Sequence, residues 1–155
     1  MDYNNEKYMK FSSELLKEIG DWIFKLELDG DRRAKLFIEF LTNKNIDNTK
    51  VFGDIFSWMK DKATQEKDSM ALYFVGRCYL EGELVQKDCE VGIENLKKSS
   101  EQGNADAFYL LGNYYRDKSN NEEALKCYRE AEKLGHELAS IAIKLLSLHC
   151  DRAFI

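Results

Sequence analysis

Small residues recur at fixed intervals in the second half of the chain, and they constrain its architecture more than any other feature. Two stretches begin with the same alanine, glycine and tyrosine at a constant offset of 36 residues: Ala71, Gly76 and Tyr79 against Ala107, Gly112 and Tyr115. They continue with three small positions at an offset of 32: Gly92, Ser99 and Gly103 against Ala124, Ala131 and Gly135. Self-similarity at such a period is typical of an array in which each repeat is one supersecondary unit.

Each unit is expected to be a helical hairpin. In the first unit, four apolar side chains have the i, i+3, i+4, i+7 spacing of one helix face: Ala71, Phe74, Val75 and Cys78. Gly76 lies within this helix, where glycine costs about 1 kcal/mol relative to alanine. Close approach of the following helix at the small positions Gly92 and Ser99 would offset that cost. Gly103 suits a left-handed helix end and Asn104 the cap of the next helix.

The first unit, "ALYFVGRCYLEG" followed by "KDCEVGIENLKKSSEQGNADA", resembles the Sel-one-like repeat, a relative of the tetratricopeptide repeat. The pattern of that family is carried by Ala71, Val75–Gly76, Tyr79, Gly82, Asp88, Gly92 and "SSEQG", and in the second unit by Ala107, Leu111–Gly112, Tyr115, Ala124, Tyr128 and "AEKLG". The second unit lacks the glycine and aspartate of the inter-helix loop. The resemblance covers about residues 69–140. It implies an all-α fold, a short α/α superhelix (solenoid) of helical hairpins, and a non-enzymatic protein–protein interaction module.

Residues 1–68 are predicted to form an irregular helical amino-terminal cap. An apolar stripe indicates a long first helix: Tyr8, Phe11, Leu15, Ile19, Trp22, Ile23 and Leu26. The turn at Asp29–Asp31 precedes a helix over 31–43, and Asn48 is placed to cap a third helix. Counting back 36 residues from Gly92 gives Phe56, which allows a decayed repeat whose two helices are 31–43 and 52–68.

The rest of the domain, residues 69–150, is predicted to hold the repeats and a terminal capping helix. This last helix, over 137–150, carries Lys144 where the earlier units have their close-packing glycine. Such a loss suits a terminal unit with nothing further to pack closely against. We expect one continuous domain.

Charge and hydropathy exclude two classes of partner. The net charge of −5 would repel phosphate backbones, and the chain has no basic patch beyond Arg32, Arg33 and Lys35, so we expect no nucleic-acid binding. No apolar run approaches the ~20 residues of a membrane span, so we expect no membrane partner. The polar start "MDYNNEKYMKF" lacks the apolar stretch of a secretory signal. We therefore expect a cytoplasmic protein.

The four cysteines are predicted to be reduced thiols. Cys78, Cys89, Cys127 and Cys150 include no CxxC pair, and their positions do not follow the paired-disulfide pattern of secreted cysteine-rich relatives. A zinc site can be drawn from Cys127, His136, His149 and Cys150, but its spacing matches no regular zinc-finger pattern. Reduced thiols in a cytosolic protein are therefore the preferred reading over a disulfide framework.

Catalytic motifs are missing from the sequence. The chain has two histidines and no phosphate-binding loop, nucleophile elbow or His-Glu-x-x-His pattern,. His136 is read as a capping or solvated residue at a helix start, and Glu122 and Glu123 as carboxylates favoured by a helix dipole. We predict no enzyme activity, no catalytic residue and no cofactor.

The resemblance implies that the first helix of each hairpin lines a concave face that binds a protein partner. If the apolar face of the first hairpin packs inward, its opposite face presents Tyr73, Arg77, Leu80 and Glu81. The matching positions of the second hairpin are Tyr109, Asn113, Arg116 and Asp117. Tyrosine and arginine are the residue types that commonly anchor interfaces. The alternative is that Tyr73 and Tyr109 fill partly buried surface between hairpins.

Three functions remain open from the sequence. The first is a small cytosolic inhibitor, such as an immunity protein, whose acidic groove engages a single protein partner; a basic partner would suit it. The second is a virulence or signalling adaptor of the Sel-one-like type. The third is an enzyme of a family whose motifs are not recognised.

Overall fold

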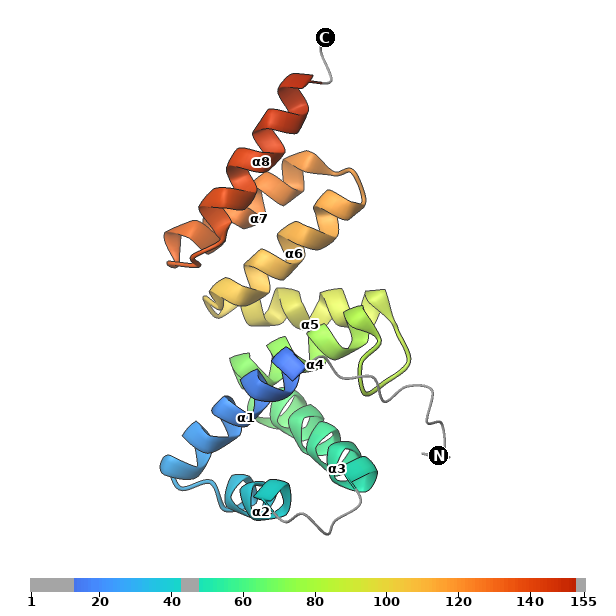
Figure 1. The fold of residues 1–155 in the computed structure, drawn as a ribbon, viewed down its shortest axis with the longest axis vertical. Helices are drawn as coiled ribbons and strands as arrows, with labels where there is room; N and C mark the ends of the chain where they lie inside the picture. Colours follow the sequence, from blue (N-terminus) through green and yellow to red (C-terminus); the bar gives the residue numbers. More distant parts are fainter. Residues whose placement is uncertain (1–12, 43–47, 153–155) are drawn as a thin grey trace.

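The computed structural model describes residues 13–42 and 48–152. Over these ranges it contains α-helices and one short π-helix, η2, with no strand, stacked along one long axis (Figure 1). In chain order the elements are α1 (Ser13–Leu28), α2 (Arg32–Thr42), α3 (Asn48–Asp61), η2 (Lys62–Glu66), α4 (Ser69–Glu81), α5 (Cys89–Glu101), α6 (Ala105–Asp117), α7 (Asn121–Lys133) and α8 (Ala139–Arg152). The predicted all-α superhelix of hairpins is confirmed.

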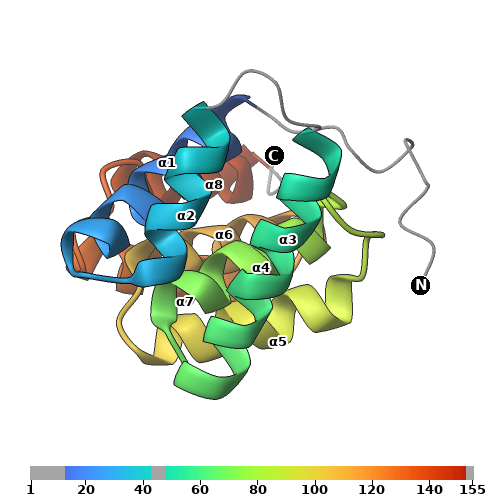
Figure 2. The ribbon, with the colours of Figure 1, turned by 90° about the horizontal axis from the view of Figure 1, so that it is seen from below.

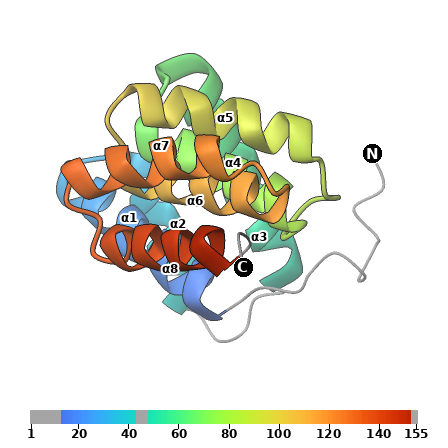
Figure 3. The same ribbon diagram turned by 90° about the horizontal axis from the view of Figure 1, so that it is seen from above.

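The two repeats form the hairpins α4–α5 and α6–α7, and α8 packs against α7. Viewed along the stack from either end, α1 and α8 lie on one side of α4 and α6, and α5 lies on the other side (Figures 2 and 3). We call the side of α4 and α6 that faces α1 and α8 the inner face. No helix within the described ranges is long and apolar enough to cross a membrane.

Side-chain caps begin the helices of the repeats. Asp68 accepts a hydrogen bond from the backbone N–H of Ala71 at 2.7 Å, and Asn104 accepts one from Ala107 at 3.1 Å. Such caps satisfy donors that the first helical turn leaves without partners. Gly103 has a φ of 82°, in the left-handed region that glycine enters without a steric penalty,. The predicted helix end at Gly103 and cap at Asn104 are confirmed.

The first hairpin closes at two glycines. A Cβ built on Gly76 would lie 2.9 Å from the carbonyl oxygen of Gly92, and a Cβ on Gly92 would lie 2.9 Å from the carbonyl oxygen of Gly76. The close approach predicted for Gly76 and Gly92 is therefore confirmed. Ser99 also lies at this approach as predicted: it is completely buried, and its hydroxyl donates to the backbone oxygen of Ser69, the first residue of α4, at 2.7 Å.

The second hairpin closes in another way. A Cβ on Gly112 would lie 2.5 Å from the ring of Tyr128. Tyr128 is completely buried, so the space at Gly112 is filled by an aromatic ring and not by the small residues Ala124 and Ala131 that match the first hairpin in sequence. Glycine is thus required at the same position of both hairpins for two different neighbours.

The amino-terminal helices share a core with the first repeat. Trp22 of α1 lies with its ring centroid 5.4 Å from Trp58 of α3 and 5.4 Å from Phe74 of α4. α2 packs chiefly against α1, whereas α3 and η2 pack against α4. In the two repeats, the two helices of a unit pack chiefly against each other. The helices predicted to form a decayed repeat, over 31–43 and 52–68, do not pack in this way. Tyr8 and Phe11, predicted to belong to the first helix, lie outside the described residues.

Candidate functional site: the inner face

Three helices present equivalent positions on the inner face, at the offsets of 36 and 32 residues that relate the repeats. In α4 these are Met70, Tyr73, Arg77 and Leu80; in α6 they are Asp106, Tyr109, Asn113 and Arg116; in α8 they are Leu138, Ile141, Leu145 and Leu148, the first of which immediately precedes the helix. The sequence prediction covered the first two helices. Each helix turns out to use this face differently.

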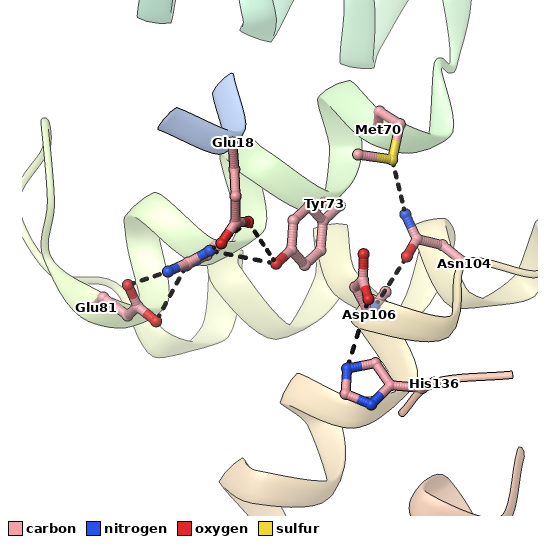
Figure 4. A network of polar contacts seen from close by, with 9 residues as sticks. Glu18, Met70, Tyr73, Glu81, Asn104, Asp106 and His136 are labelled. Atoms are coloured by element: carbon pink, nitrogen blue, oxygen red, sulfur yellow. Dashed lines mark hydrogen bonds and ion pairs between the residues drawn. The ribbon is translucent and has the colours of Figure 1, made fainter. Parts of the chain in front are cut away.

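On α4 the inner face is covered by α1. Tyr73 is 5% exposed and Arg77 is 9% exposed. Glu18 of α1 accepts a hydrogen bond from Nη1 of Arg77 at 2.8 Å, and the Tyr73 hydroxyl lies 3.5 Å from the same carboxylate (Figure 4). Glu81 also pairs with Arg77, at 3.3 Å. The prediction that Tyr73 and Arg77 are displayed to a partner is therefore wrong, because an amphipathic helix of the same chain occupies their face.

Electrostatics in this cluster favour a fixed structural contact. Burial raises the pKa of Tyr73, although the Arg77 guanidinium opposes the rise. Burial alone would lower the pKa of Arg77, but the neighbouring Tyr73, Glu81 and Glu18 raise it above its ordinary value. The phenol thus stays neutral and the guanidinium stays charged. Neither group is tuned toward neutral pH as an acid–base catalyst would be.

On α6, Tyr109 is half-buried and stacks on His136. The two ring centroids are 4.1 Å apart with an interplanar angle of 16°. Nε2 of His136 lies 3.5 Å from a carboxylate oxygen of Asp106 (Figure 4). Nδ1 accepts a hydrogen bond from the backbone N–H of Leu138 at 3.3 Å, which agrees with the predicted capping role. His136 therefore fixes the Tyr109 ring at the start of α8.

The remaining predicted residues lie at the exposed end of the hairpins. The side-chain oxygen of Asn113 accepts a hydrogen bond from the Tyr128 hydroxyl at 2.7 Å, which ties α6 to α7 within the second hairpin. Arg116 and Asp117 are exposed and pair with each other at 2.9 Å. Glu81 lies at the end of α4, beside Arg77. The structure thus brings Tyr109 and Arg116 to one accessible surface and separates them from the covered Tyr73.

On α8 the inner face is an exposed apolar stripe that the sequence analysis missed. Leu138, Ile141, Leu145 and Leu148 are 52%, 53%, 55% and 56% exposed. With α6 they border a groove of about 440 Å³, lined by Tyr109, Arg116, Asn121, Leu138, Ile141, Ala142, Leu145 and Leu146. The signal was present in the sequence, since adding 32 to Tyr109 and Asn113 gives Ile141 and Leu145.

The stripe borders the side of α8 that would receive another hairpin helix, because Tyr109 and Asn113, the equivalents of Ile141 and Leu145 on α6, both contact Tyr128 of α7. In α4 that side is marked by Gly76 and in α6 by Gly112. The equivalent residue of α8 is Lys144, which is exposed and charged. The predicted loss of the close-packing glycine in the last helix is therefore accompanied by an apolar surface on the inner face.

Metal and thiol chemistry find no support in the described side chains. No group of three histidine, cysteine, aspartate or glutamate residues among them is placed to hold a metal ion. Cys78, Cys89 and Cys127 are free thiols. Burial raises the pKa of Cys78 to about 12 and that of Cys127 to about 11, so neither is an activated nucleophile,. His149 and Cys150, the other candidates for a zinc site, have side chains outside the described set.

Comparison with known proteins agrees with the repeat boundaries. The Sel1 repeat family model matches residues 69–104 and 105–136. The fold is similar to the crystal structure of a Sel1 repeat protein from Oxalobacter formigenes, with a TM-score of 0.59 and 23% identity over 84% of this chain. The chain spans 57% of the length of that protein. No curated protein matches the chain.

A second similar structure is Helicobacter pylori cysteine rich protein B. It has a TM-score of 0.53 and 24% identity, and the match covers 82% of this chain and 92% of that one. Both likenesses show a solenoid of helical hairpins. The predicted resemblance is confirmed: residues 69–104 and 105–136 are two Sel1 repeats, and the fold around them is that of a solenoid of helical hairpins.

Proposed function

We propose that the chain is a non-catalytic module that binds one protein partner on the inner face of α6 and α8. Sel1 repeat proteins are protein-interaction modules. The observation that supports this site is the stripe of four half-exposed apolar side chains beside the groove. Contiguous apolar surface of this kind on a folded chain is typical of an interaction site.

The proposed contact set differs from the predicted one. It keeps Tyr109, Asn113, Arg116 and Asp117 and adds the apolar stripe on α8. It leaves out Tyr73 and Arg77, which lie beneath α1, and Glu81, which pairs with Arg77. A tyrosine beside an apolar surface is the kind of residue in which binding energy concentrates.

The partner proposed here is a basic protein that the chain inhibits, as an immunity protein inhibits a toxin. The support is electrostatic, since a net charge of −5 attracts a basic protein and repels an acidic one,. In this role the chain acts in the cytoplasm and blocks one partner stoichiometrically.

Affinity capture with matched variants tests the site. We would use the full chain, the variant Leu145→Asp in the stripe, and the control Leu36→Asp on α2, where the leucine is 52% exposed, much as Leu145 is. A basic protein retained by wild type and by Leu36→Asp but lost with Leu145→Asp supports the proposal. Identical sets of captured proteins for all three chains would contradict it.

A further inference from the structure

The spacing along the α8 stripe matches the face of another helix. Leu138, Ile141, Leu145 and Leu148 are separated by three, four and three residues, the spacing of a seam that accepts side chains of a facing helix between its own. The stripe runs for ten residues, or about 15 Å at 1.5 Å per residue. It offers no unpaired backbone edge, which an extended peptide needs in order to add as a strand.

The chain already carries one helix on the equivalent face of α4. There Glu18 of α1 lies 2.8 Å from Nη1 of Arg77 and 3.5 Å from the Tyr73 hydroxyl. Both contacts join an amphipathic helix to the first helix of a hairpin. The inner face therefore accommodates a helix at its covered end, and its open end has the same register.

One carboxylate lies beside the groove, at the start of α6. Asp106 precedes the groove-lining Tyr109 by one helical turn, and its side chain is 54% exposed. Glu18 of α1 lies near Tyr73 and is paired with Arg77 (Figure 4). The charge of Arg116 is offset by Asp117. A bound helix would therefore have leucine and isoleucine side chains on one flank and the Asp106 carboxylate on the other.

We propose that the segment that binds this groove is a basic amphipathic α-helix. Its apolar face packs on Leu138, Ile141, Leu145 and Leu148, and a lysine or arginine side chain on its other flank reaches Asp106. This rests on the proposed function and names the chemistry of the partner. A second copy of this chain suits the groove less well, because each copy has a net charge of −5.

The test is a selection from a phage-displayed library of random 16-residue peptides on the immobilised full chain. We expect the enriched peptides to carry apolar residues at i, i+3 or i+4, and i+7, with lysine or arginine beside them. Synthetic versions should gain helical circular dichroism on binding. Leu145→Asp should lower the affinity for these peptides at least tenfold, whereas Leu36→Asp should leave the affinity unchanged.

Charge variants test the second flank. Asp106→Lys should lower affinity several-fold and reduce its dependence on salt, whereas Glu132→Lys on α7 should change neither. Equal effects of Asp106→Lys and Glu132→Lys would overturn the basic part of the proposal. The melting temperature of each variant shows whether it remains folded.

Other outcomes separate this inference from the proposed function. Enriched peptides that are extended, rich in proline or acidic, and that still lose binding with Leu145→Asp, overturn the helix and leave the groove as the site. Peptides insensitive to Leu145→Asp, or no enrichment at all, overturn the inference, while the capture experiment still decides the function. A concentration-dependent dimer in sedimentation that Leu145→Asp abolishes would assign the stripe to a second copy.

Discussion

Glu18 and Arg77 lie 59 positions apart in the sequence, and their side chains meet at 2.8 Å. This contact fastens α1 over the inner face of the first repeat and leaves the equivalent surface of α6 and α8 open. One end of the inner face is thus covered by the chain's own helix, and the other end is not.

Loss of the Glu18 charge should destabilise the chain. Arg77 would remain buried with Glu81 as its one charged neighbour, and a weakened contact to a buried charge costs more than an exposed pair contributes. Because Glu18 is partly exposed, we expect Glu18→Gln to lower the free energy of unfolding by about 1–2 kcal/mol. Urea unfolding measures this. The exposed Glu14 of α1 provides the control Glu14→Gln, which should change stability by less than about 0.5 kcal/mol.

The change in stability caused by a side chain added at a glycine should depend on the atoms that surround that glycine. A Cβ at Gly76 meets backbone, and one at Gly112 meets the buried Tyr128 ring, so Gly76→Ala and Gly112→Leu should each destabilise by about 1–3 kcal/mol. Gly20 of α1 has nothing within 4 Å of its Cβ position. Gly20→Ala should therefore stabilise by up to about 1 kcal/mol. Thermal melts should place Gly20→Ala above wild type and the other two variants below it. Any other order would contradict the close packing assigned to Gly76 and Gly112.

The repeats could be predicted because their signal is local. Gly76 and Gly103 mark a close packing and a helix end within one hairpin, and both roles follow from backbone sterics. The filling of Gly112 by Tyr128 could not be predicted in the same way. The first hairpin suggested a small neighbour, and the sequence does not show which side chain turns into the gap.

The candidate site was predicted only in part. Tyr109 and Arg116 lie on the open surface as expected, but the cover over Tyr73 depends on a carboxylate 55 residues away, at Glu18. A helix's apolar stripe does not say which partner helix it will cover. Leu145 could have been placed on the inner face from the sequence, because it lies 32 residues after Asn113, the equivalent position of the second repeat. It differs from Asn113 in being apolar.

Stability should fall in alkali. Burial raises the pKa of the Cys78 thiol to about 12 from its ordinary value of 9.0. Between these values the unfolded chain loses a proton that the folded chain keeps, so the stability present below pH 9 is lost as the pH rises toward 12. One thiol contributes a slope of up to about 1.4 kcal/mol per pH unit. Urea unfolding from pH 7 to 10.5 should show a shallower decline for Cys78→Ala than for wild type. Parallel curves would contradict this assignment.

The thiols should also differ in reactivity. Titration after denaturation without reductant should find four free cysteines. In the folded chain Cys89, which is partly exposed, should react before the buried Cys78, because reagents reach Cys78 only when the hairpin opens. A denatured chain with fewer than four reactive thiols would indicate disulfides and an oxidising compartment.

The two inner-face tyrosines should separate folding from binding. Tyr73 is 5% exposed beneath α1, so Tyr73→Ala should lower the free energy of unfolding by about 3–5 kcal/mol, as truncation of a buried aromatic ring does. Tyr109 lines the open groove. Tyr109→Ala should therefore weaken binding of the captured partner by about 2 kcal/mol, or roughly thirtyfold in affinity.

Calorimetric titration of the partner into each folded variant distinguishes these effects. Tyr73→Ala, measured well below its melting temperature, should bind within about threefold of wild type, because its ring contacts the chain's own helix. Arg116→Glu should leave a basic partner bound or speed its association, since the change adds to the negative charge of the groove. If Tyr73→Ala weakened binding as much as Tyr109→Ala, α1 would have to move aside for the partner. The covered end of the inner face would then belong to the site.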